Sequence, residues 1–121
     1  MASVLVADDE KLILSVLKKV LGTRQHEVIA VESGQAALDV LRQRNIDLLL
    51  ADVDMRPMDG LDLLKQVRAL YPKLPVVMMT AFGTVSTAIS TMTLGAFDYI
   101  TKPIKIEELI DVIEHALSAA R

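Results

Sequence analysis

Short apolar runs alternate with longer segments of helical periodicity along the whole chain of 121 residues. The clearest run, residues 48–51 (LLLA), is continuously apolar, which is typical of a strand covered on both faces. Four other short, largely apolar runs are each followed by a segment of helical pattern. These runs are residues 4–7, 27–31, 76–79 and 97–100. This alternation predicts five βα units on a parallel sheet, and therefore a doubly wound α/β fold.

Capping residues and helix breakers mark several of the expected helix ends. Gly22 follows the apolar pattern of the first helix and predicts its end, and Ser33 can cap the second helix. The third helix is expected to end before Pro72. A fourth and weaker helix is expected from Thr84 to Leu94, because its many Ser and Thr residues compete for backbone hydrogen bonds.

The composition excludes several classes of protein. The absence of Cys removes disulfides, thiolate metal sites and cysteine nucleophiles, and 13 basic against 16 acidic residues without a basic run argue against nucleic-acid contact. Residues 74–97 carry no charge, but Pro, Gly and seven Ser or Thr residues argue against a membrane span. Acidic residues from position 8 exclude a secretory signal. We therefore expect one cytoplasmic domain, residues 1–121, that contacts neither nucleic acid nor membrane.

Residues that can bind a cation or an anion follow four of the five predicted strands. Asp8 and Asp9 follow the first strand, Asp52 the third, Thr80 the fourth and Lys102 the fifth. Because ligands bind beyond the carboxyl ends of parallel strands, we expect these five residues to converge. Three neighbouring carboxylates require a cation, and a site of oxygen ligands favours Mg²⁺. With a lysine and a hydroxyl nearby, the pattern predicts an aspartyl phosphate.

Four segments, VLVADDE, LLLADVDMRPMDG, VVMMTAFG and GAFDYITKP, resemble the receiver domain of two-component response regulators over essentially the whole chain. The resemblance implies a (βα)5 sheet of flavodoxin-like type with strand order 2-1-3-4-5. It implies that Asp52 is the phosphoacceptor. It also implies that Mg²⁺ is held by Asp8, Asp9, Asp52 and the backbone carbonyl of Asp54.

The resemblance extends to residues that would respond to the phosphoryl group. It implies that Thr80 and Lys102 contact this group, that Thr80 and Tyr99 are the switch residues, and that the bond before Pro103 is cis. TAFG and GAFDYITKP are most similar to receivers of nitrogen-regulator type or receivers linked to helix-turn-helix outputs. The implied partners are a sensor histidine kinase or phosphotransfer protein, an output domain or effector that controls transcription, and a second copy after phosphorylation.

Three surfaces are expected to meet such partners. Leu14 lies at the edge of the apolar stripe of the first helix, so we expect partial exposure, and the resemblance implies that this helix meets the histidine kinase. Met55 lies in the loop after the third strand and can face a partner. Thr84, Ser90 and Thr91 are expected on the solvent face of the fourth helix, which the resemblance implies is part of the signalling surface.

Two other functions compete with a receiver that is phosphorylated once and does not turn over substrate. Asp52 and Asp54 form a DxD pattern that resembles haloacid-dehalogenase-type phosphatases. In those enzymes the pattern opens the first strand, whereas here it follows the third, and 121 residues leave little room for their larger core. The second alternative is an interaction module whose pocket is never phosphorylated.

Overall fold

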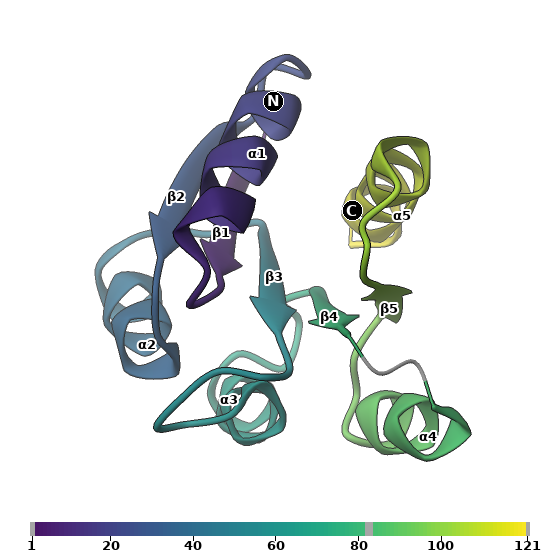
Figure 1. Cartoon of the computed structure of the whole chain (residues 1–121). Helices are drawn as coiled ribbons and strands as arrows, with labels where there is room; N and C mark the ends of the chain where they lie inside the picture. The colour runs from purple at the N-terminus through teal and green to yellow at the C-terminus, as the bar shows by residue number, and fades with distance from the viewer. Residues whose placement is uncertain (1, 82–83, 121) are drawn as a thin grey trace.

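The computed structural model describes residues 2–81 and 84–120. Its architecture is a five-stranded parallel sheet between two layers of helices (Figure 1). The strand order is β2-β1-β3-β4-β5, as predicted. The strands are β1 (Ser3–Ala7), β2 (Glu27–Val31), β3 (Leu48–Asp52), β4 (Val76–Thr80) and β5 (Asp98–Thr101). The helices are α1 (Lys11–Gly22), α2 (Gly34–Gln43), α3 (Gly60–Leu70), α4 (Val85–Thr93) and α5 (Ile106–Ala119).

Each face of the sheet has its own hydrophobic core. One core packs α1 and α5 against the sheet, and the other core packs α2 and α3, with the segment after α4, against the opposite face (Figure 1). All residues of β3 and β4 are buried, which explains why residues 48–51 and 76–79 are continuously apolar. Among the helices in the described part of the chain, none is long and apolar enough to cross a lipid bilayer.

The register of the strands aligns their carboxyl ends at one edge of the sheet. Ala7 pairs with Ala51, and Thr80 pairs with Thr101. Asp52 at the end of β3 pairs with Met79 of β4. The residues that follow β1, β3 and β5 therefore start from the same edge, although they are far apart in the sequence.

The helix ends follow local chemistry and agree closely with the predicted limits. The side chain of Ser33 accepts a hydrogen bond from the backbone N–H of Ala36 at 3.1 Å, so it caps α2 as predicted. Asp59 and Thr84 cap α3 and α4 in the same way. Gly22 is the last residue of α1 rather than the first residue after it, a difference of one position.

Three residues that we expected to be exposed to partners are buried. Leu14 is 8% exposed because it packs into the core beneath α1, and Met55 is 2% exposed because it turns toward the core beneath α3. Thr91 is 1% exposed, and its hydroxyl donates a hydrogen bond to the carbonyl of Thr87 at 2.8 Å. This bond satisfies the hydroxyl inside the protein, so a buried threonine costs little there. The expected exposure of these three residues was wrong.

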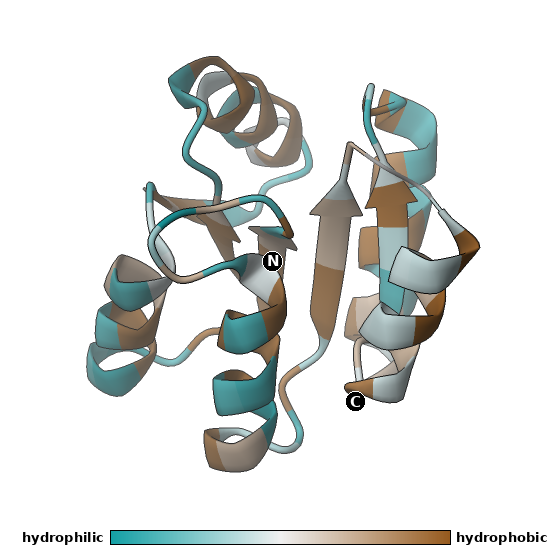
Figure 2. Cartoon of the chain, turned by 60° about the horizontal axis from the view of Figure 1, so that its bottom comes forward, coloured by the Kyte–Doolittle hydropathy of each residue, from teal (hydrophilic) through white to brown (hydrophobic). Residues whose placement is uncertain are grey.

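The outer face of α4 is more apolar than the sequence pattern indicated. Thr84 and Ser90 are exposed, as predicted. Val85, Ile89 and Met92 are also exposed, at spacings of four and three residues that place them in one stripe. Figure 2 shows α4 in white and brown, the colours of weakly polar and hydrophobic residues. The helix therefore presents an apolar stripe to solvent.

Candidate functional site

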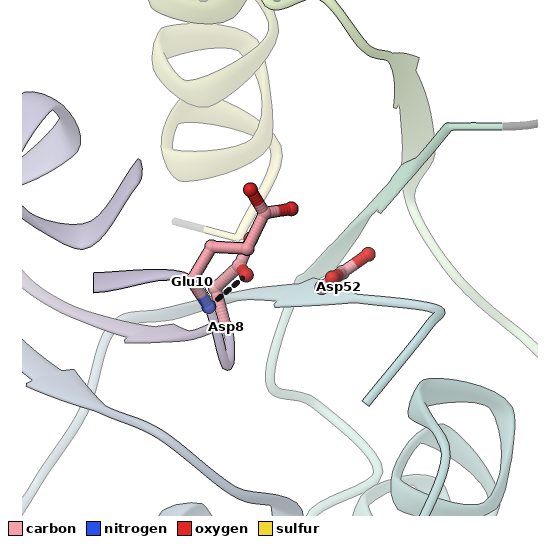
Figure 3. A group of neighbouring side chains, drawn as sticks. All are labelled: Asp8, Glu10 and Asp52. Atoms are coloured by element: carbon pink, nitrogen blue, oxygen red, sulfur yellow. Dashed lines mark hydrogen bonds between the residues drawn. The ribbon is translucent and has the colours of Figure 1, made fainter. Parts of the chain in front are cut away.

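Three acidic side chains meet at the carboxyl edge of the sheet (Figure 3). Asp8 follows β1 and is fully buried, and Asp52 is the last residue of β3 and 2% exposed. Glu10 lies two residues after Asp8 and is exposed. One carboxylate oxygen from each of the three lies within 4.8 Å of the others. Carboxylate oxygens at this separation can share one hard divalent cation.

Lys102 reaches this acidic cluster from the end of β5. Its Nζ atom lies 3.1 Å from Oδ2 of Asp8 and 3.2 Å from Oδ2 of Asp52. A longer contact of 3.5 Å joins it to Oε1 of Glu10. The lysine side chain is only 13% exposed, so these ion pairs are poorly screened by solvent. One ammonium group thus offsets part of the negative charge of three carboxylates.

Backbone N–H groups hold the other oxygens of the two buried carboxylates. The N–H of Glu10 donates to Oδ1 of Asp8 at 2.9 Å, and the N–H of Asp54 donates to Oδ1 of Asp52 at 3.1 Å. Each buried carboxylate therefore has one oxygen on the backbone and the other against Lys102. This arrangement fixes the rotation of both carboxylates.

Burial and charge shift the pKa of two groups in the site. Burial raises the pKa of the Asp8 carboxyl above its ordinary value, and the hydrogen bonds from Glu10 and Lys102 offset only part of this effect. Burial alone would lower the pKa of Lys102, but its hydrogen bond to Asp8 and the charge of Asp52 raise the pKa above the ordinary value. The lysine therefore stays charged, while the cost of ionising Asp8 favours binding of a further cation.

A cavity of about 550 Å³ opens above the cluster. Asp9 and Asp54, both predicted to serve the metal site, are exposed and line this cavity, although neither belongs to the close acidic cluster. The loop between β3 and α3 forms one wall. The cavity thus gives a small anionic group access to the oxygens of Asp52. Its lining residues are Asp9, Glu10, Asp52, Val53, Asp54, Met55, Arg56, Asp59, Ala81 and Lys102.

The remaining predicted site residues lie on β4 and β5. Thr80 ends β4, is buried, and accepts the backbone N–H of Lys102 on its carbonyl at 2.8 Å. Tyr99 is half-buried in β5 and packs against the core beneath α2 and α3. The Lys102–Pro103 bond is cis, the isomer that the resemblance implies, and the Arg56–Pro57 bond is cis as well.

Glu10 is the residue of this cluster that sequence reasoning missed. It directly follows the two aspartates in VLVADDE, but no role was predicted for it from the sequence. The structure shows no capping hydrogen bond from its side chain, which instead faces Lys102. The sequence places Glu10 beside the two aspartates, but the direction of its side chain depends on how α1 leaves the sheet edge.

The fold and site together define a receiver-type α/β protein with an acidic pocket at the switch point of the sheet. The family model of the response regulator receiver domain matches residues 4–114. The chain therefore belongs to the response regulator receiver domain family and is the receiver of a two-component regulator. It is a signalling domain and not a member of the phosphatase class with the DxD pattern.

The curated relatives are named as response regulators or as regulators of transcription. The chain is 42% identical over 117 residues to the response regulator protein FleR of Pseudomonas aeruginosa, covering 96% of this chain and 25% of that protein. It is 40% identical over 113 residues to the DNA-binding transcriptional regulator NtrC of Escherichia coli, covering 93% and 24%. The chain thus spans about a quarter of the length of these curated relatives.

Solved structures agree with this assignment. The receiver domain of the Francisella response regulator 1452 superposes with a TM-score of 0.95 at 30% identity, and all of both chains is covered. NtrX from Brucella abortus superposes with a TM-score of 0.93 at 36% identity, covering 98% of this chain and 27% of that one. The similarity to receivers of nitrogen-regulator type was predicted from TAFG and GAFDYITKP.

Proposed function

We propose that Asp52 accepts a phosphoryl group from a phosphohistidine of a sensor kinase or phosphotransfer protein. The observation that carries this proposal is the arrangement of its carboxylate. Oδ1 is held by the N–H of Asp54, and Oδ2 lies 3.2 Å from Lys102, beneath an open cavity. An oxygen of Asp52 forms a new bond to phosphorus while the phosphorus–nitrogen bond breaks. The bonding electron pair stays on the imidazole nitrogen of the donor.

Asp8, Glu10 and Asp52 fit a magnesium ion, and Asp9 and the carbonyl of Asp54 are further candidate ligands from the same cavity. When bound, Mg²⁺ neutralises negative charge on the phosphoryl oxygens as they approach the carboxylates. Three carboxylates close together without softer ligands support this choice of metal.

The chain itself contributes orientation and charge to the transfer. Lys102 supplies a fixed positive charge beside the accepting oxygen, and the hydroxyl of Thr80 at the end of β4 contacts a phosphoryl oxygen. The phosphoryl group adds a charge of about −1.5 to −2 at this edge of the sheet. We propose that Thr80 and Tyr99 transmit this change to α4. Unchanged hydrogen exchange across residues 84–102 on phosphorylation would contradict this step.

An apolar groove of about 280 Å³ between α1 and α5 supports docking of the kinase beside the site. Leu12, Val16 and Ile106 line it with exposed side chains, and Lys102 and Pro103 border it next to the acidic cluster. Leu12 and Val16 replace Leu14, which is buried, as the proposed partner surface on α1. We propose that residues 1–121 act as one receiver domain that controls an output domain, because the longer relatives include a DNA-binding transcriptional regulator.

Intact-mass measurement with acetyl phosphate and Mg²⁺ tests the acceptor. The unaltered chain should gain the mass of one phosphoryl group, whereas Asp52→Asn and the chain with excess chelator should not. Turnover of donor without a lasting mass increase would show that the phosphoryl group is lost as fast as it is gained. An unchanged mass without turnover would favour an interaction module without phosphorylation. A Val16→Glu variant should slow transfer from a phosphorylated kinase domain and leave transfer from acetyl phosphate unchanged.

A further inference from the structure

The first residue of α3, Gly60, lies directly against the backbone of the proposed phosphoacceptor. Its N–H donates to the carbonyl of Val53 at 2.8 Å. A Cβ atom at position 60 would lie 2.1 Å from the carbonyl oxygen of Asp52 and 2.7 Å from the Cα of Val53. Both neighbours are backbone atoms, so no side-chain rotation can relieve these contacts. A side chain here requires the backbone of residues 52 and 53 to move.

We propose that Gly60 is a positioning residue for Asp52. The absence of a Cβ lets the first turn of α3 rest on the end of β3, and this contact sets where the Asp52 carboxylate lies. The proposal rests on the proposed function of Asp52 as the phosphoacceptor. It assigns to the start of α3 a role in phosphoryl transfer besides its role in packing.

The end of β3 is held from two sides. On one side, the N–H of Val53 donates to the carbonyl of Met79 on β4 at 2.8 Å. On the other side, Gly60 closes against the backbone of Asp52 and Val53. With β4 fixed in the core, the space for the backbone of Asp52 is defined by α3. A backbone that moves here also moves the N–H of Asp54, which holds Oδ1 of Asp52.

The displacement that a methyl group demands is large for a reacting group. Cβ contacts shorter than 3.0 Å essentially never occur, so the 2.1 Å contact must lengthen by about 1 Å or more. Misplacement of a reacting atom by about 1 Å can lower a rate by roughly 100-fold. The change would also alter the 3.2 Å contact between Asp52 and Lys102, which orients the other oxygen.

Gly34 provides a matched control. Like Gly60, it is the first residue of a helix and follows a residue that caps the helix, here Ser33. A Cβ at Gly34 would meet the Sδ of Met58 at 2.8 Å, the far end of a flexible side chain. Gly→Ala changes the helix propensity equally at both positions. The two variants therefore differ in what the new methyl group meets.

The test compares Gly60→Ala with Gly34→Ala and the unaltered chain. Phosphorylation by acetyl phosphate and Mg²⁺ is followed by intact mass, the amide signals of residues 52–54 by NMR, and the free energy of unfolding by urea. We expect G60A to be phosphorylated roughly 100-fold more slowly and to shift these amide signals. We expect G34A to match the unaltered chain. Equal rates and unshifted amide signals in folded G60A would overturn the proposal.

A second pair of variants serves if G60A does not fold. Asp59 caps α3 by accepting the N–H of Asp62 at 2.8 Å. Asp59→Asn removes the charge and keeps a good cap, whereas Asp59→Ala removes both and loosens the first turn of α3. D59A should be phosphorylated more slowly than D59N, and equal rates would overturn the proposal. If the unaltered chain takes no phosphoryl group, the proposed function fails, and the amide signals alone decide whether Gly60 positions Asp52.

Discussion

Helices α3 and α4 begin alike but are held very differently. Each follows a strand that ends in the site, and each starts at a capping residue, Asp59 or Thr84. Beyond the first turn, α3 buries Leu63, Leu64 and Val67 against the sheet. In α4 the buried side chain is that of Thr91. The helix beside the proposed phosphoacceptor is therefore fixed by packing, whereas few buried side chains hold the helix after Thr80.

The difference between the two helices suits a switch. Burying a leucine stabilises a fold by about 1.5–3 kcal/mol, so α3 gains several times the packing energy that α4 gains. A site that orients a reacting carboxylate needs a fixed neighbour, and α3 supplies one. The proposed movement of α4 on phosphorylation requires that few buried contacts break. The exposed stripe of Val85, Ile89 and Met92 lies on this weakly packed helix.

Truncating a side chain in each helix should show the difference in global stability. Leu63 is fully buried, so Leu63→Ala should lower the free energy of unfolding by about 2–5 kcal/mol through lost burial and a residual cavity. Ile89 is 61% exposed, so Ile89→Ala should change it by no more than about 0.5 kcal/mol. Urea denaturation of both variants measures the two values. A loss in I89A as large as that in L63A would show that α4 is packed as firmly as α3.

Removing a helix cap should distinguish local from global effects. The Oγ1 of Thr84 accepts the N–H of Thr87 at 3.1 Å, so Thr84→Ala should cost α4 about 1 kcal/mol. Because few buried contacts tie α4 to the sheet, we expect faster amide exchange within α4 and an unchanged urea midpoint. Ser33→Ala on α2 is the matched control, and it should lower the midpoint of the whole domain. T84S should behave as the unaltered chain, and a midpoint loss in T84A equal to that in S33A would contradict the prediction.

The firmly packed part of the molecule, the central strands and the site at their carboxyl ends, could be predicted from the sequence. Continuous apolar runs located β3 and β4, and the polar residue at each strand end placed Asp8, Asp52 and Lys102 at one edge. These inferences hold because a strand covered on both faces of a parallel sheet must be apolar along its whole length. Glu10 was missed because its role depends on the direction of α1 at the sheet edge, which periodicity does not specify.

The weakly packed helix α4 and the loop after β3 were predicted less well. Most residues of α4 are Ser, Thr or Ala, so their pattern does not show clearly which side faces the sheet. The structure turns Thr91 inward and Ile89 outward, the reverse of the expectation from polarity. Met55 was also misjudged, because a loop has no periodicity from which burial can be inferred. The backbone contact at Gly60 depends on the path of that loop and was not predicted.

The charge of Asp8 at the carboxyl edge of the sheet should have a smaller effect on the free energy of unfolding, because opposing contributions act on its pKa. Burial raises its pKa, while the N–H of Glu10 and the ammonium of Lys102 oppose this. The folded chain thus holds the Asp8 proton to higher pH than the unfolded chain. Ionising Asp8 therefore lowers stability as the pH rises from the unfolded value of 3.8 through the folded pKa.

An Asp8→Asn variant cannot ionise at this position. Without divalent cations, it should unfold at a higher urea concentration than the unaltered chain at neutral pH, and the difference should vanish below about pH 4. Mg²⁺ should stabilise the unaltered chain more than D8N, because it offsets the charge that D8N lacks. If packing by α3 holds the carboxyl edge of the sheet in place, removing the charge of Asp8 raises the free energy of unfolding. If D8N is instead less stable at neutral pH, the ion pair with Lys102 holds the edge, and the contrast with α4 is one of charge rather than packing.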